Sequence, residues 1–383
     1  MGIPNNPIKL PQYDNSILSV SASLAQYYGI KTSYKTLAVL DKELEKDYKN
    51  IILFVCDGLG VNVLEHHLPF DSFLRVNQCE TISSVFPPTT AAATTSVLSV
   101  KTPIEHGWLG WACWFEQYQK CVELFLGTDL YTGEKVPFFD SGFNQMPYDS
   151  LWTMISHHNQ DVQAQVVYPD KIARNGLKSL HQMTVRLQDI TRQGGRQFVY
   201  AYWQEPDSSS HKNGPYHSIV QKKVGVINKR LKKMVSQLED TLLIVTADHG
   251  HIEINGYIYI NDCGRMVDCL LKPLSIEDRC VSCFVKSDMK EIFEQEFQHY
   301  LSQDFLLLTR EQVLSAHLFG EGVKHTLTDD MIGDYLLIGI TDKCLVQKMP
   351  HGRDVFICKG AHAGLTQDEM TVPLILIPSL DKR

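Results

Sequence analysis

The chain has 383 residues, of which 44% are hydrophobic, so it is long enough to bury a large core. This length is typical of two to three domains, or of one large α/β domain that carries an insertion. A formal net charge of −8 argues against general binding to nucleic-acid duplexes or to anionic membranes. We find no uninterrupted apolar run of about 18 residues, so the sequence predicts no membrane span.

The N-terminal residues and the cysteines bear on where the protein is found. Residues 1–16 are rich in proline and asparagine, and they lack the basic start and the apolar stretch of a secretory signal. The ten cysteines are scattered, so we expect reduced thiols and a cytoplasmic location. Cys280 and Cys283 have the spacing of a zinc knuckle, but no second pair follows at the usual distance, which favours a structural role.

The predicted elements are short apolar strands and helices. In chain order they are a helix over 35–48, strands over 50–57 and 198–203, a helix over 217–238, and strands over 241–248 and 371–377. The strands are continuously apolar, as expected of strands that are covered on both faces. This pattern predicts an α/β fold in which a mostly parallel central sheet is flanked by helices.

Residues 264–325 have a different pattern. It predicts a strand over 279–286, a helix over 289–302, a strand over 304–309 and a helix over 310–319. We interpret 264–325 as a small α+β cap subdomain, inserted into a core that consists of 1–263 and 326–383. The apolar run over 333–340 is expected to return to the main body.

Two of the predicted strands end in acidic residues. Asp57 ends the strand over 50–57 and is followed by glycines, which suits either a metal ligand beyond a strand end or an Asp-Gly turn. Asp248 and His249 end the strand over 241–248, where the alternative is a helix N-cap beside an incidental histidine. His251 follows two residues later, and we interpret it as a support for a ligand.

Further candidate ligands lie in two other segments. Asp207 and His211 are four residues apart, a spacing that lets two side chains converge on one ion. His362 lies in GAHAG, whose small neighbours would let a metal or a substrate come close. A lone histidine is also common in cores and on surfaces, so only the other candidate ligands make His362 a credible ligand.

A hydroxyl nucleophile is available in VFPPTTAAATTS. The two prolines precede Thr89 and Thr90, and Ala91–Ala93 favour a helix start, where free N–H groups attract a phosphate. A threonine hydroxyl is a poor nucleophile near neutral pH, and metal coordination would activate it. The alternative is that either threonine only caps the helix.

Taken together, FVCDGLG, VFPPTT, EPDSSSH, TADHGH and GAHAG occur in an order that resembles the alkaline phosphatase superfamily. Within it, the chain resembles the type I phosphodiesterase / nucleotide pyrophosphatase family over roughly 50–260 and 326–378. The resemblance implies an alkaline-phosphatase-like three-layer fold and two divalent metal ions, usually zinc, with manganese as the alternative. It implies Thr90 as a nucleophile that forms a covalent phosphothreonine, and we prefer Thr90 to Thr89 on the match to the motif. It also implies that one ion is held by Asp57, Thr90, Asp248 and His249, and the other by Asp207, His211 and His362.

We therefore expect a two-metal hydrolase of small phosphate esters, acting on a phosphodiester or a pyrophosphate, with a nucleotide as one option. No arginine lies close in sequence to Thr90, which favours a diester, because a dianionic monoester needs such a cation more. The alternatives are a phosphomonoesterase or phosphonate hydrolase of the same superfamily and, outside enzymes, a catalytically silent member that binds a ligand.

Two positions depart from the family pattern. The family has an asparagine three residues after the nucleophile, where this chain has Ala93, so an oxyanion donor would have to come from backbone N–H groups or from elsewhere. The glycine that is usual before the second-metal histidine is Ser210. Trp108 and Trp111 are candidates for a substrate pocket that stacks on a flat group, although indoles at this spacing are also ordinary core residues.

Overall fold

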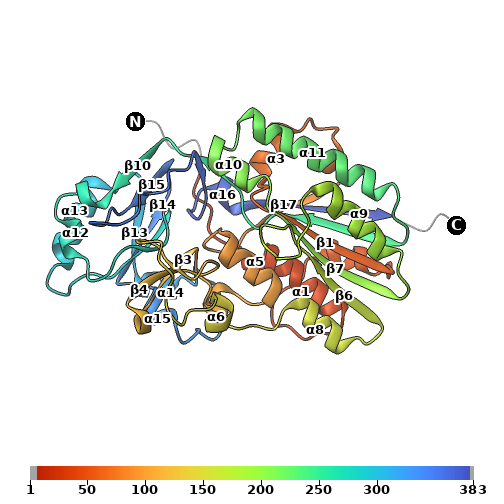
Figure 1. Cartoon of the computed structure of the whole chain (residues 1–383), viewed down its shortest axis with the longest axis horizontal. Coiled ribbons are helices and arrows are strands. Elements are labelled where there is room, and N and C mark those ends of the chain that lie inside the picture. Colours follow the sequence, from red (N-terminus) through yellow and green to blue (C-terminus); the bar gives the residue numbers. More distant parts are fainter. Residues whose placement is uncertain (1–6, 380–383) are drawn as a thin grey trace.

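A computed structural model describes residues 7–379 and has two lobes, each built on its own β-sheet (Figure 1). The larger lobe has a six-stranded sheet in the order β2-β17-β8-β1-β7-β6. The bounds of these strands, in that order, are Gln78–Ser83, Thr371–Ser379, Thr241–Thr246, Asn50–Cys56, Arg196–Trp203 and Val162–Val167.

The four predicted core strands are confirmed as β1, β7, β8 and β17. Neighbours in the run β8-β1-β7-β6 are parallel, and only β17 is antiparallel to the strands on either side of it. Every residue of β1 and of β8 is buried, which explains why these segments are apolar throughout and do not alternate.

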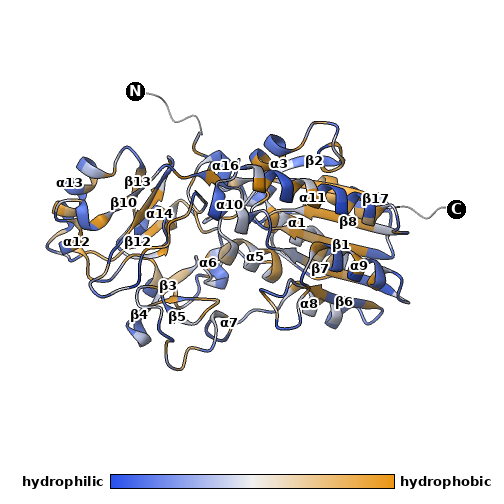
Figure 2. Cartoon of the chain, turned by 45° about the horizontal axis from the view of Figure 1, so that its top comes forward, coloured by the Kyte–Doolittle hydropathy of each residue, from blue (hydrophilic) through white to orange (hydrophobic). Residues whose placement is uncertain are grey.

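Helices cover both faces of this sheet, which gives the predicted three layers (Figure 1). Figure 2 shows the apolar strands enclosed between helices whose outer faces are polar. The predicted helix over 35–48 is shorter, because α2 (Ala38–Leu44) ends before Asp47, whose φ of 53° is left-handed. One face carries α1 (Ile17–Tyr27), α5 (Thr90–Ser99) and α8 (Leu151–His158). The other face carries α3 (Val61–His67), α9 (Leu180–Thr191) and α11 (Ser218–Val235). The helix α11 is the one predicted over 217–238.

The smaller lobe contains a seven-stranded antiparallel sheet in the order β13-β14-β12-β11-β3-β4-β5. Four of its elements are the ones expected within 264–325: β12, β13, α13 (Lys290–Tyr300) and α14 (Arg310–Ser315). The strands, in sheet order, are Phe305–Thr309, Tyr335–Gly339, Cys280–Cys283, Ser275–Glu277, Ala112–Phe115, Lys120–Glu123 and Thr128–Asp129.

The expectation that 333–340 returns to the main body is wrong, because β14 lies between β12 and β13 in the smaller sheet. Its side chains enter two different apolar clusters: Leu336 lies in the cluster that contains Phe86 and Phe319, and Leu337 in the one that contains Phe293. A central strand that is covered on both faces reads as a continuous apolar run, so its sequence looks like that of a parallel core strand. The sheet thus extends beyond 264–325 on both sides of that segment.

Two further expectations concern membranes and cysteines. Within residues 7–379 no helix combines the length and the apolar character that a bilayer crossing requires. All ten cysteines are free thiols, and Cys280 and Cys283 are buried in β12, which agrees with a structural role.

Candidate active site

Three predicted segments meet at one edge of the larger sheet. Asp57 directly follows β1, Asp248 and His249 follow β8, and Asp207 opens α10 (Asp207–Asn213) after β7. Because β8, β1 and β7 are adjacent and parallel, their carboxyl ends lie side by side. The backbone fixes the register there, since Asp57 N–H donates to the Trp203 carbonyl and Asp207 N–H donates to the Asp57 carbonyl.

Gly58 allows the two sides of this edge to approach each other. Its φ is +69°, and a Cβ there would lie 2.8 Å from Cδ2 of His251 and 3.0 Å from the Cα of Asp207. Only glycine combines this backbone conformation with such close approach. The Gly58 N–H also donates to Oδ1 of Asp248 at 3.1 Å, which ties the β1 end to the β8 end.

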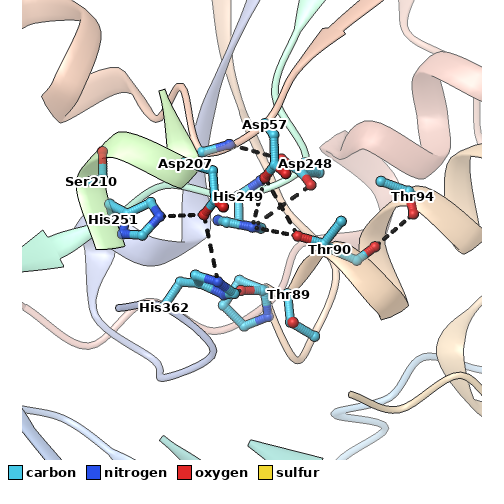
Figure 3. Close-up of polar contacts among 12 residues, drawn as sticks. Asp57, Thr89, Thr90, Thr94, Asp207, Ser210, Asp248, His249, His251 and His362 are labelled. Carbon is cyan, nitrogen blue, oxygen red and sulfur yellow. Dashed lines mark hydrogen bonds and ion pairs between the residues drawn. The ribbon is translucent and has the colours of Figure 1, made fainter. Parts of the chain in front are cut away.

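One group of side chains surrounds the Thr90 hydroxyl at the start of α5 (Figure 3). Thr90 Oγ1 lies 3.2 Å from Nε2 of His249 and 3.4 Å from Oδ1 of Asp57. His249 Nε2 in turn lies 3.3 Å from Oδ1 of Asp57 and 3.7 Å from Oδ2 of Asp248. That Oδ2 is buried and has no hydrogen-bond partner among residues 7–379. A buried carboxylate oxygen without a donor is what an ion would satisfy.

A second group surrounds Asp207. Its Oδ1 lies 3.1 Å from Nε2 of His211, which is one helical turn further along α10, and 3.8 Å from Nε2 of His362. His251, which is fully buried, lies closer still, with Nε2 at 2.6 Å from the same oxygen. His362 enters from a different part of the chain, directly after β16 (Gly360–Ala361), which pairs with β9 (Ile252–Glu253).

The other ring nitrogen of three histidines is bonded to a backbone carbonyl. Nδ1 of His211 lies 2.8 Å from the Gly360 oxygen, and Nδ1 of His249 lies 2.9 Å from the Gly250 oxygen. Nδ1 of His362 lies 3.0 Å from the Pro88 oxygen. A carbonyl accepts from a proton on Nδ1, so Nε2 is the nitrogen that faces the carboxylates and is available to a cation bound among them. This outer arrangement is the one that orients metal-ligating histidines.

The carboxylates crowd negative charge into a buried space. Burial and the neighbouring Asp207 charge raise the pKa of Asp57 well above its usual range, and burial and the Asp57 charge do the same to the pKa of Asp248. At Asp207, burial is outweighed by the His211 charge and by hydrogen bonds from His211 and His251, which hold its pKa well below the usual range. Bound cations would neutralise this buried charge.

The structure brings together all seven predicted side chains. Two clusters of the described residues have the composition of a metal site: Asp57, Asp248 and His249 in one, and Asp207, His249, His251 and His362 in the other. Imidazole and carboxylate ligands at this spacing fit divalent cations. His251, interpreted from the sequence as a support for a ligand, is itself a member of the second cluster. The only signal for it in the sequence is its position two residues after His249.

The two adjacent threonines have different surroundings. Thr90 Oγ1 faces Asp57 and His249 (Figure 3). Thr89 Oγ1 instead donates to Oε1 of Glu277 at 2.5 Å. This geometry favours Thr90 as the reactive hydroxyl. No pattern in the sequence indicates Glu277, because it lies 188 positions away on β11, in the segment interpreted as a cap.

The two candidate pocket tryptophans differ in exposure. Trp108 is 4% exposed, and its indole Nε1 donates to the Met146 carbonyl at 3.0 Å, so Trp108 is a core residue and not an open pocket wall. Trp111 is 37% exposed, its ring lies 5.7 Å from that of Phe125, and its backbone N–H donates to Oε1 of Glu277 at 2.7 Å. Of the two indoles, only that of Trp111 is exposed, and its Nε1 donates to Oε1 of Glu123 at 3.0 Å.

Comparisons with known proteins point to one family. The family model of type I phosphodiesterase / nucleotide pyrophosphatase matches residues 51–304. A curated relative, bis(5'-adenosyl)-triphosphatase enpp4 of Xenopus laevis, is 39% identical over 77 residues, and this match covers only 17% of that protein's length and 17% of this chain.

Solved structures share the fold at low sequence identity. Murine ectonucleotide pyrophosphatase / phosphodiesterase 5 superposes with a TM-score of 0.64 at 12% identity, covering 87% of this chain and 90% of that one. An inactive variant of that murine protein in complex with AMP gives 0.62 at 13% identity over 85% and 87% of the two chains. Phosphonoacetate hydrolase from Sinorhizobium meliloti 1021, in complex with phosphonoformate, gives 0.61 at 15% identity over 85% and 89%.

The family match spans well over half of the chain and includes Asp57, Thr90, Asp207 and Asp248. The fold likenesses agree with it, since they are to alkaline phosphatase superfamily members. The chain therefore belongs to the type I phosphodiesterase / nucleotide pyrophosphatase family, a family of metal-dependent phosphoester hydrolases within the alkaline phosphatase superfamily.

Proposed function

We propose that this protein hydrolyses a small phosphodiester or pyrophosphate, with Thr90 as the nucleophile. The observation that carries the proposal is the position of Thr90 Oγ1, 3.4 Å from Asp57 and 3.2 Å from His249, at the first residue of α5. A hydroxyl in this position lies beside an anion-binding helix N-terminus and inside a cluster of metal-ligand side chains.

Two ions fit the donors. We assign one to Asp57, Thr90, Asp248 and His249, and the other to Asp207, His211 and His362. His211 contacts Asp207 at 3.1 Å but lies outside the cluster that Asp207 and His362 form with His249 and His251. Three imidazoles with carboxylate and hydroxyl oxygens suit zinc, with manganese as the alternative. Bound divalent cations lower the pKa of a nearby hydroxyl and neutralise negative charge on phosphoryl oxygens.

The reaction divides into two displacements at phosphorus. Thr90 Oγ1 attacks phosphorus, the bond from phosphorus to the leaving oxygen breaks, the proton lost by the threonine ends on that leaving oxygen, and a phosphothreonine ester forms. Water then attacks the same phosphorus, the bond to Thr90 Oγ1 breaks, and the threonine oxygen takes up the proton that the water gives up. In this proposal the N–H groups at the start of α5 bind a phosphoryl oxygen in both steps. They take over the role of the family's asparagine, whose position is occupied here by Ala93.

A diester is favoured over a dianionic monoester by the state of Arg279. Arg279 is fully buried and engaged by Glu369 through two bonds of 2.7 and 2.8 Å, so its charge is already neutralised. Without a free guanidinium to pair with it, a second negative charge on phosphorus is disfavoured.

A phosphonate is the second candidate substrate, because a phosphonoacetate hydrolase shares the fold. Comparing bis-p-nitrophenyl phosphate, p-nitrophenyl phosphate and phosphonoacetate at saturating zinc separates the candidates. We expect the diester to have the highest kcat/KM. A higher kcat/KM for the monoester or for phosphonoacetate would overturn the diester assignment.

We also propose a cytoplasmic location, because all ten cysteines are free thiols. Cell fractionation tests this, with recovery in the soluble cytoplasmic fraction expected and recovery from an oxidising compartment as the contrary result.

A further inference from the structure

Glu277 reaches from the smaller lobe to the segment that carries the nucleophile. It is the last residue of β11, and its Oε1 accepts hydrogen bonds from Thr89 Oγ1 at 2.5 Å and from the Trp111 N–H at 2.7 Å. Thr89 immediately precedes Thr90. The contact therefore joins the smaller sheet to the first turn of α5, where the substrate phosphoryl group is proposed to bind.

Thr89 is the N-cap residue of α5, yet its side chain does not cap the helix. Its backbone is extended, with φ −138° and ψ 148°, and its carbonyl accepts the first helical bond from the Ala93 N–H at 2.8 Å. A threonine in this position ordinarily accepts a bond from the second or third N–H of the helix. These N–H groups belong here to Ala91 and Ala92.

Other helices of the same chain show the ordinary arrangement. The side chain of Ser16 accepts from the Leu18 N–H at the start of α1, and the side chain of Thr309 accepts from the Gln312 N–H at the start of α14. The N-caps of α8 and α9 also accept such bonds. Ser72 also precedes a helix without such a bond, so the missing bond alone does not set α5 apart. The distinguishing feature of α5 is that the hydroxyl of its N-cap residue donates to a carboxylate of the other lobe.

We propose that Glu277 is a positioning residue that keeps the N-terminus of α5 open for the substrate phosphoryl group, by holding the Thr89 hydroxyl away from the helix N–H groups. This inference rests on the proposed function. In the absence of Glu277, the Thr89 hydroxyl is free to cap α5 and competes with the phosphoryl oxygens for the same donors.

A rival view makes the opposite prediction. If the Glu277 carboxylate acts only through its negative charge, its removal relieves repulsion and tightens the binding of an anion. If it acts by holding Thr89, its removal weakens the binding, and removal of the Thr89 hydroxyl restores it. The two views therefore predict opposite changes in anion affinity when Glu277 is removed. Desolvation of the partly buried carboxyl raises the pKa of Glu277 to about 7, so measurements at about pH 8 compare variants with the ionised wild-type residue.

The test measures the affinity of inorganic phosphate for the zinc-loaded protein by calorimetry, together with kcat and KM for bis-p-nitrophenyl phosphate. We expect Glu277→Ala to weaken phosphate binding and to raise KM by about fivefold, the factor that corresponds to one N-cap bond of about 1 kcal/mol. Glu277→Gln keeps an acceptor for Thr89 and should stay within about twofold of wild type. The double variant Glu277→Ala/Thr89→Val should return to the affinity of Thr89→Val alone.

Melting temperature and zinc content of each variant show whether it is folded and loaded. Unchanged or tighter phosphate binding in Glu277→Ala, or a double variant as weak as Glu277→Ala, would overturn the inference. Failure of the proposed function has a different signature, because the wild-type protein itself would then not cleave the diester.

Discussion

Replacing Arg279 with methionine should destabilise the protein and loosen the second metal site. Arg279 lies at the turn between β11 and β12, and its guanidinium donates to both carboxylate oxygens of Glu369 in α16 (Gln367–Met370), at 2.7 and 2.8 Å. Both side chains are fully buried. Glu369 also accepts from the Gly364 N–H at 2.7 Å and from Thr366 Oγ1 at 2.6 Å, in the loop that carries His362.

The magnitude follows from the burial of both charges. Arg279→Met leaves the Glu369 carboxylate buried without its counter-charge, which costs about 3–5 kcal/mol. At about 2.1 cal/mol/K per residue, the unfolding entropy of 383 residues is about 0.8 kcal/mol/K. The melting temperature should thus fall by about 4–6 °C. Because Glu369 holds the His362 loop, the zinc affinity of the second site should fall by about tenfold.

The assay is thermal unfolding of the metal-free protein, followed by zinc titration against a competing chelator. Arg279→Met/Glu369→Gln removes both charges and should cost less than Arg279→Met alone. As a matched control, Lys324→Met breaks the exposed pair with Asp329 and should shift the melting temperature by less than about 1 °C. An equally small shift for Arg279→Met, or a double variant less stable than the single one, would refute the reasoning.

The remaining predictions concern pH and metal removal. Burial lowers the pKa of His106 to about 3, whereas an unfolded histidine titrates near 6.5, so the unfolded chain binds the extra proton and stability falls as pH drops from about 6.5 towards 3. His106→Gln should reduce the decrease in the free energy of unfolding between pH 6 and 4 by up to about 1.4 kcal/mol per pH unit. Guanidinium unfolding at several pH values measures this, and the same pH dependence in wild type and variant would contradict the prediction. Chelation of zinc should lower the melting temperature, because Asp57 and Asp248 then repel each other without a cation. Asp248→Asn should stabilise the metal-free protein and reduce bound zinc to about one ion per chain; two ions by elemental analysis would show that Asp248 is not a ligand.

The sequence predicts that the candidate ligand segments come together, because their positions follow from local rules. Asp57 and Asp248 each lie at or just beyond the end of a buried apolar strand, and adjacent parallel strands bring such ends to one edge. His211 follows Asp207 by one helical turn, so its position also depends on nearby residues only. The order of these segments along the chain was sufficient to indicate the family.

Contacts between distant segments could not be predicted in this way. His362 is placed by a loop that Glu369 and Arg279 hold, and Thr89 is turned by Glu277 from the other lobe. The apolar run of β14 has the composition of a core strand in either sheet, so only its partners decide where it lies. The burial of Trp108, which the sequence suggests as a pocket residue, depends on packing against residues such as Met146, which are distant in sequence.

The most direct test of the central claim compares wild type with Thr90→Ala in zinc content and in hydrolysis of bis-p-nitrophenyl phosphate. We predict about two zinc ions per chain in both proteins and no measurable turnover in Thr90→Ala, because the six other ligands remain while the nucleophile is lost. Thr89→Val is the matched control and should keep both its zinc and its activity. Substantial turnover by zinc-replete Thr90→Ala, or a wild-type protein that binds fewer than about two ions, would contradict the account.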